Sequence, residues 1–352
     1  MNQNNINGMR VEGFDALRGL CALGVVFYHM LNWFSLPYPF TLGLHGVYIF
    51  FALSGASLYI AYSEKINSGE SLVAYLGARY FRLLPLYALI LVSIPWVDSK
   101  PFDWGYVELL VLNVTFAFGF ASPGQSSLVT GGWSLGIEFC FYLMFPCVVA
   151  LLKMRRVAVA GLLVVLFFCQ QIFVNKVLAV PGSLVANWVQ YVQPLAFAFY
   201  FVAGCAIGRY FKITNWMPWA QRRPRFVLFS FLTMLVVIGS CSGRSTEETL
   251  TGLRGALLPL LCILLVFLSG MLQFKGNWKR VAEVLGNMSY GVYLLHPVVH
   301  TLVARYAGQL RSNPILYIIG IAVITAVIAL AVEKYYERPI RNLGKKIFAS
   351  AG

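Results

Sequence analysis

Arg18 and His29 are the residues of this sequence whose types and spacing most clearly suggest chemistry. They stand eleven residues apart in the largely apolar segment GFDALRGLCALGVVFYHMLNWF. At about 100° and about 1.5 Å per residue, this spacing puts both side chains on one face of a helix, about 16 Å apart along its axis. Charged or titratable groups inside a membrane span are costly and usually functional. With Arg18 near one membrane surface and His29 deep in the span, the pair could connect a charged, water-soluble donor to chemistry inside the bilayer.

His29 carries the chemistry in this interpretation. The pKa of imidazole is ordinarily about 6.5, so the neutral ring can take a proton from a hydroxyl or attack a thioester. The structural alternative is that Arg18 extends to lipid headgroups and His29 only hydrogen-bonds to a neighbouring helix. The shared face, and further polar residues in other apolar segments, favour the chemical interpretation.

A pair of arginines stands at the start of another apolar segment, in YLGARYFRLLPLY, residues 75–87. Arg79 and Arg82 lie one helical turn apart, and Pro85 follows just inside the expected span. Guanidinium groups match the geometry of phosphate, so this pair could hold a monophosphate or a diphosphate at the cytoplasmic surface. The alternative is a basic anchor that contacts anionic lipid.

Polar residues recur at helical spacing in TGGWSLGIEFCFYLMFP, residues 130–146. Ser134, Glu138 and Tyr142 follow one another at every fourth position, which gives a polar stripe on an apolar helix. An unpaired carboxylate inside a membrane would be protonated, so Glu138 is expected to have a partner, with His29 or an arginine as the first choices. A glutamate that only locks helices together is the structural alternative.

A second polar stripe runs along LGNMSYGVYLLHPVVH, residues 285–300. Ser289, Tyr293, His296 and His300 share one helix face, and Pro297 loosens the backbone hydrogen bonding beside His296. We expect His300 at the outer interface. Aromatic residues at the membrane interface and polar groups that pair helices would produce a similar pattern.

The composition, with 59% hydrophobic and 11% charged residues, predicts a multi-pass membrane protein. We expect an all-α bundle of about ten transmembrane helices, which forms a single domain over residues 1–352. Residues 1–10 are expected to be a mobile leader, and residues 98–130 a long extracytoplasmic loop. The expected spans are 14–34, 45–62, 83–97, 133–152, 157–174, 187–209, 226–242, 253–273, 284–304 and 315–335.

Basic residues are unevenly distributed between the two sides of this predicted bundle. With both termini cytoplasmic, 21 of the 27 Lys and Arg residues fall in cytoplasmic segments and 6 in outer segments, in line with the positive-inside rule. The net charge of +14 is therefore a topology signal, and no soluble basic face points to nucleic acid. Residues 105–121 could form an eleventh span, which would invert every later loop. We interpret them instead as a re-entrant or surface-lying part of the outer loop.

The sequence lacks the motifs of several other kinds of site. The seven cysteines form no C-x-x-C pair, so neither a disulfide framework nor a metal site is expected. No glycine-rich phosphate loop or dinucleotide fingerprint occurs, and so there is no sign of nucleotide hydrolysis or of a bound dinucleotide. We expect no metal and no permanently bound cofactor, and the sequence predicts no oligomeric state.

In combination, these segments resemble the integral-membrane acyltransferase family three, the carbohydrate O-acyltransferases of bacterial envelopes. The matching motifs are D-x-L-R with a histidine eleven residues after the arginine, F-F-x-L-S-G, R-x-x-R-L-x-P-x-Y, W-S-L-x-x-E-x-x-F-Y, S-Y-x-x-Y-L-x-H and E-x-P. The residues that match are, in this order, Asp15, Leu17, Arg18 and His29; Phe50, Phe51, Leu53, Ser54 and Gly55; Arg79, Arg82, Leu83, Pro85 and Tyr87; Trp133, Ser134, Leu135, Glu138, Phe141 and Tyr142; Ser289, Tyr290, Tyr293, Leu294 and His296; and Glu337 and Pro339. The last motif is expected to end the final helix with a local ion pair.

The resemblance implies transfer of an acyl group, usually acetyl, from cytoplasmic acyl-CoA to a sugar hydroxyl of an envelope or exported polysaccharide or glycolipid. It implies a location in the bacterial inner membrane, with membrane lipids and a sugar or lipid-linked glycan as partners. The chain looks like the stand-alone form of the family, without the hydrolase-like extracytoplasmic domain that some members carry at the C-terminus.

The resemblance also implies roles for the residues singled out above. His29 would be catalytic, as a base or as a transient carrier of the acyl group, and Glu138 would orient or polarise it. Arg18, Arg79 and Arg82 would bind the phosphates of acetyl-CoA, which is the donor substrate. The residues expected to bind substrate are Ser134, Tyr142, Tyr293 and His296, of which Ser134, Tyr293 and His296 would contact the acceptor or the oxyanion.

Two other classes of function remain open from the sequence. A polar stripe through ten helices could belong to a transporter or to a flippase-like component of polysaccharide export, although no pair of broken helices occurs at matching positions in two halves. A non-catalytic scaffold in polysaccharide assembly agrees less well with buried Arg, His and Glu residues in the order that a donor would meet them.

Overall fold

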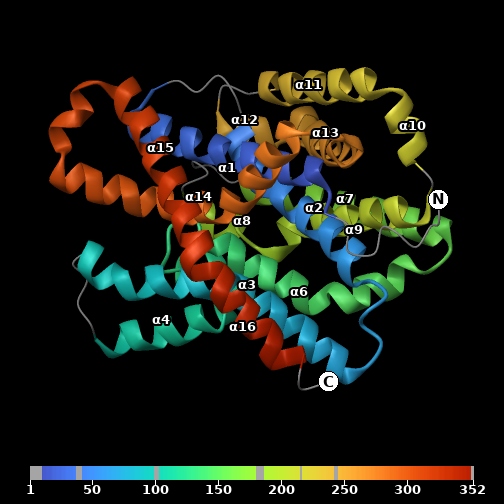
Figure 1. The fold of residues 1–352 in the computed structure, drawn as a ribbon, viewed down its shortest axis with the longest axis horizontal. Helices are drawn as coiled ribbons and strands as arrows, with labels where there is room; N and C mark the ends of the chain where they lie inside the picture. The colour runs from blue at the N-terminus through green and yellow to red at the C-terminus, as the bar shows by residue number, and fades with distance from the viewer. Residues whose placement is uncertain are drawn as a thin grey trace.

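The protein is a bundle of helices (Figure 1). The computed structural model describes residues 10–36, 42–98, 103–179, 186–214, 216–241 and 245–349, and these residues form helices and turns but no strand. The all-α prediction is therefore confirmed. Most of the predicted leader, residues 1–9, and part of the predicted outer loop, residues 99–102, lie outside the described residues.

Long helices form the bundle, and shorter ones connect or flank them. The long helices are α1 (Glu12–Trp33), α2 (Leu42–Tyr62), α3 (Gly69–Asp98), α6 (Trp133–Leu152), α7 (Arg156–Leu178), α9 (Pro194–Ile213), α11 (Pro224–Ser240), α13 (Gly252–Met271), α14 (Asn277–Tyr306) and α15 (Pro314–Val332). The shorter elements are α4 (Trp104–Val114), η2 (Ala117–Phe120), α5 (Pro123–Ser126), α8 (Trp188–Tyr191), α10 (Met217–Arg222), α12 (Thr246–Leu250), η3 (Gly308–Ser312), η4 (Glu333–Glu337) and α16 (Arg338–Ala349).

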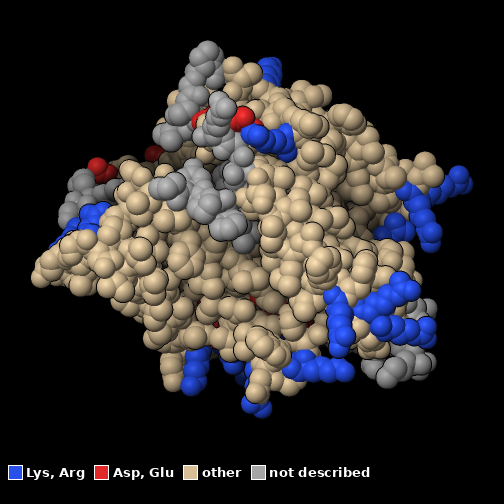
Figure 2. Space-filling model, turned by 90° about the horizontal axis from the view of Figure 1, so that it is seen from above, with Lys and Arg blue, Asp and Glu red and all other residues tan. Residues whose placement is uncertain are grey.

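Within the described residues, eight helices are long and apolar enough to cross a membrane. Each of the ten predicted spans overlaps a helix, but α11 and α14 are not among these eight. Helix α11 has only 17 residues, and the charged and polar residues of α14 lower its hydropathy. Large apolar side chains are exposed on many helices, and Figure 2 shows Lys and Arg at the margins of a broad uncharged face. This is the surface of a multi-pass membrane protein.

The predicted start of the third span, residue 83, is later in the sequence than the start of the helix. Helix α3 starts at Gly69 rather than at residue 83, so Arg79 and Arg82 lie inside a continuous helix and not in a segment that leads into it. The early turns of α3 are stable because one face packs on the bundle, where the Tyr75 side chain is buried. The two arginines are therefore held at fixed positions relative to the apolar half of the same helix.

The segment 105–121 does not form an eleventh span. Helix α4 has 11 residues, or about 16 Å of helix, whereas crossing the hydrocarbon takes about 20 residues. Phe116 follows with a positive φ of 57°, and this left-handed residue turns the chain into η2.

The motif Glu337-Arg338-Pro339 does not end the last helix, contrary to the sequence prediction. The π-helical turn η4 connects α15 to α16, and the chain stays helical to Ala349. Pro339 is tolerated because it stands in the first turn of α16, where its missing backbone N–H costs few helical hydrogen bonds. The ion pair of Arg338 is made with Glu333 and not with Glu337.

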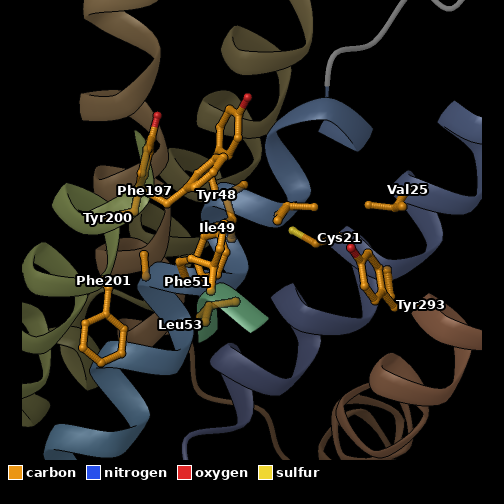
Figure 3. Packing of buried hydrophobic residues seen from close by; sticks show 14 of the residues in the cluster. Cys21, Val25, Tyr48, Ile49, Phe51, Leu53, Phe197, Tyr200, Phe201 and Tyr293 are labelled. Atoms are coloured by element: carbon orange, nitrogen blue, oxygen red, sulfur yellow. The ribbon is translucent and has the colours of Figure 1, made fainter. Parts of the chain in front are cut away.

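Helix α2 packs between α1 and α9, as the labelled side chains in Figure 3 show. Phe51 of α2 lies against Phe197 of α9, with ring centroids 5.2 Å apart. Glycines allow this close approach, because a Cβ added to Gly204 would lie 2.0 Å from the Ala52 carbonyl oxygen, and one added to Gly55 would lie 2.2 Å from the Phe201 carbonyl oxygen of α9. Gly55 and Gly204 thus allow α2 and α9 to pack with their backbones in close contact.

Gly204→Ala is expected to destabilise the bundle by about 1–3 kcal/mol, because the new Cβ forces α9 away from α2. The measurement is the unfolding temperature of the purified protein in detergent. Gly161→Ala on α7 is the matched control, since a Cβ there meets nothing within 4 Å and the helix gains propensity. Equal unfolding temperatures for the two variants would contradict the close-packing argument.

Candidate active site

The bundle encloses a cavity of about 290 Å³, here called the central chamber. Its walls come from α1, α2, α3, α6 and α14, so segments far apart in the sequence meet around it. Seven of the nine predicted site residues line it, and these are Arg18, Arg79, Arg82, Ser134, Glu138, Tyr142 and Tyr293. The two predicted residues outside this lining are His29 and His296.

The hydrogen-bond partners of Glu138 are neither His29 nor an arginine, the two alternatives predicted from the sequence. Its Oε1 atom accepts hydrogen bonds from Ser54 Oγ at 2.7 Å and from Tyr142 OH at 2.6 Å. Among the described residues it has no contact with His29, so the predicted pairing of these two residues is not seen. The carboxylate is satisfied instead by a hydroxyl from α2 and by the tyrosine one turn along α6.

The three arginines at the chamber have unequal partners. Arg18 donates to Ser57 Oγ at 2.6 Å and to the Leu53 carbonyl at 3.2 Å, and its Nη1 lies 3.5 Å from Asp15. Arg79 donates to the hydroxyl of Tyr62 at 2.9 Å and lies over the ring of the same tyrosine. Arg82 has no hydrogen bond or ion pair within the described part of the chain, although it also lines the chamber. Its donors are available to a ligand.

A second cavity, of about 270 Å³, adjoins the chamber and is here called the basic vestibule. It shares Arg18, Arg79, Arg82 and Tyr290 with the chamber, so the arginines form the boundary between the two spaces. The other side chains that line it are Arg10, Asp15, Asn287, Glu333, Glu337, Arg341 and Lys345, beside Gly286. With six basic and three acidic residues around it, the vestibule favours an anion.

The two histidines outside the chamber stack on each other. His29 of α1 and His296 of α14 have ring centroids 5.3 Å apart at an interplanar angle of 28°. Trp33 continues the stack from His29, and His300 lies 4.3 Å from the Trp33 ring. His296 is 1% exposed, and its Nε2 atom has no hydrogen-bond partner in the described residues. A buried, unpartnered ring nitrogen is rare and suits a reacting group.

Tyr293 connects the histidine pair to the chamber. Its hydroxyl donates to the Gly131 carbonyl at 2.9 Å and lies 3.0 Å from Ser134 Oγ, while its ring centroid lies 6.4 Å from that of His296. A line of contacts therefore runs from Ser134 on the chamber wall through Tyr293 to the stacked imidazoles. The sequence predicts that Tyr293 and His296 share one face of α14, whereas their connection to Ser134 of α6 is a finding of the structure.

Other residues of the site were not assigned a site role from sequence. Ser54 stands inside a recognised motif, but only the fold shows that it bonds to Glu138. Trp33 follows His29 by four residues, so its place in the stack could have been predicted from helix periodicity. Within the described residues, no group of three His, Cys, Asp or Glu side chains could hold a metal ion.

A family model for an acyltransferase domain matches residues 11–334. The chain belongs to this acyltransferase family. The resemblance carried by the sequence motifs is thereby confirmed, and the match includes every predicted site residue. No solved structure matches this chain significantly.

Relatives of this acyltransferase domain include YrhL of Bacillus subtilis, named as a peptidoglycan O-acetyltransferase, which is 29% identical over 96% of the chain. The O-acetyltransferase OatA of Staphylococcus aureus is 26% identical over 96% of the chain. ORF330 of Acidianus two-tailed virus, named as an acetyltransferase, is 26% identical over 81% of the chain and 82% of its own length. The chain spans 56% of the length of YrhL and 58% of that of OatA.

Tyr293→Phe is expected to lower the free energy of unfolding by about 1–3 kcal/mol, because Ser134 and the Gly131 carbonyl lose a buried partner. The unfolding temperature in detergent measures this effect. Tyr306→Phe on the same helix is the control, since Tyr306 is 77% exposed. If the two substitutions lower the unfolding temperature equally, the Tyr293 hydroxyl is not a structural link.

Proposed function

We propose that the protein is a membrane O-acetyltransferase that transfers an acetyl group from acetyl-CoA to a sugar hydroxyl of a bacterial envelope or exported glycan. The observation that carries the proposal is the position of Arg18, Arg79 and Arg82 between the basic vestibule and the central chamber. Acyl-CoA has a charged nucleotide joined to a long neutral arm, so its phosphates suit the vestibule and its arm suits the chamber. Membership of the family and the names of the relatives support the acetyl group and the hydroxyl acceptor.

The proposed orientation puts the vestibule on the cytoplasmic side of the inner membrane. Arg79, Arg82, Arg341 and Lys345 all belong to segments that the positive-inside rule assigns to the cytoplasm. Acetyl-CoA would then enter from the compartment in which it is made. The acceptor would approach the stacked histidines, which lie toward the other end of α1 from Arg18.

His29 is the proposed catalytic base. A nitrogen of its ring takes the proton of the sugar hydroxyl while the hydroxyl oxygen attacks the thioester carbonyl. The new carbon–oxygen bond forms, the carbon–sulfur bond breaks, and the departing thiolate takes up a proton to give free CoA. In the alternative order, His29 first accepts the acetyl group from the thioester and then passes it to the hydroxyl. The ring needs the same position in both mechanisms. Stacking on His296 supports the ring in one orientation.

Glu138 has a different proposed role from the one that its motif implied. Its hydrogen bonds hold the hydroxyls of Ser54 and Tyr142 in the chamber wall, close to the boundary formed by the arginines. There it would position the donor arm rather than polarise His29. Ser134, Tyr142, Tyr293 and His296 remain the proposed substrate contacts. Ser134, Tyr293 and His296 extend from the chamber toward His29, and Tyr142 lines the chamber beside Glu138.

His29→Ala is expected to reduce acetyl transfer at least about 100-fold, because one positioned base contributes about 10²–10⁴-fold. The measurement is release of CoA thiol by purified protein in lipid nanodiscs, with acetyl-CoA and a glycan acceptor. His300→Ala is the control, as it removes the same ring from the outer end of the stack. Transfer at the wild-type rate by His29→Ala would eliminate the catalytic role of His29.

A transporter for glycan would also have cavities inside a helical bundle, so the cellular test has to separate the two functions. We expect deletion of the gene to remove one acetyl unit from a surface glycan while the amount of exported glycan stays unchanged. Mass spectrometry of surface glycans from wild-type and deletion cells measures both quantities. Loss of export with unaltered acetylation would favour the transporter.

A further inference from the structure

The C-terminal helix α16 forms one wall of the basic vestibule. Arg341 and Lys345 stand four residues apart, so they share one face of this helix, and both line the vestibule. The other basic residues of the cavity are Arg79 and Arg82 of α3, Arg18 of α1, and Arg10, which lies two residues before α1. Nothing in the sequence motifs assigned a site role to α16.

Helix α16 is fixed against α3, as Figure 1 illustrates. Gly77 of α3 faces the ring of Phe348, and Gly344 of α16 faces the ring of Phe81, each so closely that an added Cβ would lie 2.5 Å from ring carbon. The Phe81 and Phe348 rings lie 5.9 Å apart. These paired contacts set the position of α16 along α3, and hence the distance of its basic face from Arg79 and Arg82 on α3.

The acidic residues of the vestibule leave part of its positive charge uncompensated. Glu333 takes two hydrogen bonds from Arg338, which does not line the cavity, and one at 3.3 Å from Arg341. Asp15 pairs with Arg10 and Arg18. In the described residues, neither Arg82 nor Lys345 forms an ion pair, although both line the cavity. A ligand with more than one phosphate would supply the missing negative charge.

A buried acceptor in the same cavity points to a nucleotide rather than to phosphate alone. The Glu337 side chain is 4% exposed, and its Oε1 atom has no hydrogen-bond partner among the described residues. Ribose hydroxyls and the amino group of adenine are hydrogen-bond donors, whereas an ionised phosphate group offers mainly acceptors. A nucleoside that carries several phosphates therefore matches both the cations and the free acceptor.

We propose that α16 completes the nucleotide-binding half of the donor site, with Arg341 and Lys345 binding phosphate at the end of acyl-CoA farthest from the thioester. This inference rests on the proposed function, because it takes acyl-CoA as the donor. Arg18, Arg79 and Arg82 lie at the chamber boundary and bind the part of the donor nearer the neutral arm. Arg341 and Lys345 line only the vestibule and so bind the part that the arm does not reach.

The test compares two donors, acetyl-CoA and S-acetyl-4′-phosphopantetheine, which has the same thioester and arm but no nucleoside. For Arg341→Ala and Lys345→Ala, we expect KM for acetyl-CoA to rise about tenfold with kcat unchanged. KM for S-acetyl-4′-phosphopantetheine should stay at the wild-type value, because that donor does not reach α16. A merely structural role would change both donors alike.

Two other basic residues of α16, Arg338 and Lys346, serve as controls. Arg338→Ala removes a guanidinium from the same helix and disturbs the same Glu333, but Arg338 does not line the vestibule. Lys346→Ala removes the neighbouring lysine, which is exposed and also outside the cavity lining. Both control variants should keep the wild-type KM for acetyl-CoA. Lys345 has no ion pair in the described residues, so Lys345→Ala tests the proposal even if Arg341→Ala folds poorly.

Two results would overturn the inference while leaving the proposed function intact. One is an equal KM for acetyl-CoA in the vestibule variants and their controls. The other is an effect seen only as altered dependence on anionic lipid, measured in nanodiscs with and without phosphatidylglycerol, which would make α16 a headgroup site. If the wild-type protein uses neither thioester, the proposed function itself fails, and that outcome is distinct from both.

Discussion

Arg18 places a permanent positive charge inside a bundle of apolar helices, where a charge without partners is strongly unfavourable. Its side chain is 20% exposed and is compensated by Asp15 on its own helix and by Ser57 and a backbone carbonyl of α2. These bonds require α1 and α2 to lie close together and in a fixed register. They also leave the guanidinium at the boundary of the chamber and the vestibule.

The position of α2 in turn depends on its other neighbour. Gly204 of α9 lies so close to the Ala52 carbonyl that no side chain fits between them, and Phe51 and Phe197 pack beside this contact. Because α2 is held from both sides, Ser54 and Ser57 face the chamber side of the helix at fixed points. The hydroxyls that satisfy Glu138 and Arg18 are thus provided by one rigid element.

Much of this arrangement was accessible from the sequence, because it follows from helical periodicity and from the chemistry of single residues. Arg18, Arg79 and Arg82 were predicted to act together, and they meet at one boundary. The partner of Glu138 was predicted wrongly, because Ser54 is a short neutral side chain on another helix and its proximity depends on the packing of α2. Arg341 and Lys345 were counted only as part of the topology signal, since their place in the vestibule depends on a helix that was expected to stop at Pro339.

Arg18 and His29 lie in different surroundings although both belong to α1. The carboxylate and the arginines lie around the chamber, whereas the imidazoles of His29 and His296 form their own stack beyond Tyr293. A carboxylate beside His29 would bring a charged group into this aromatic stack. Because Glu138 is satisfied by hydroxyls instead, the histidine pair stays among aromatic side chains. The charged residues that line the two cavities therefore lie apart from the histidine pair, so the proposed phosphate site and the proposed base occupy different parts of the bundle.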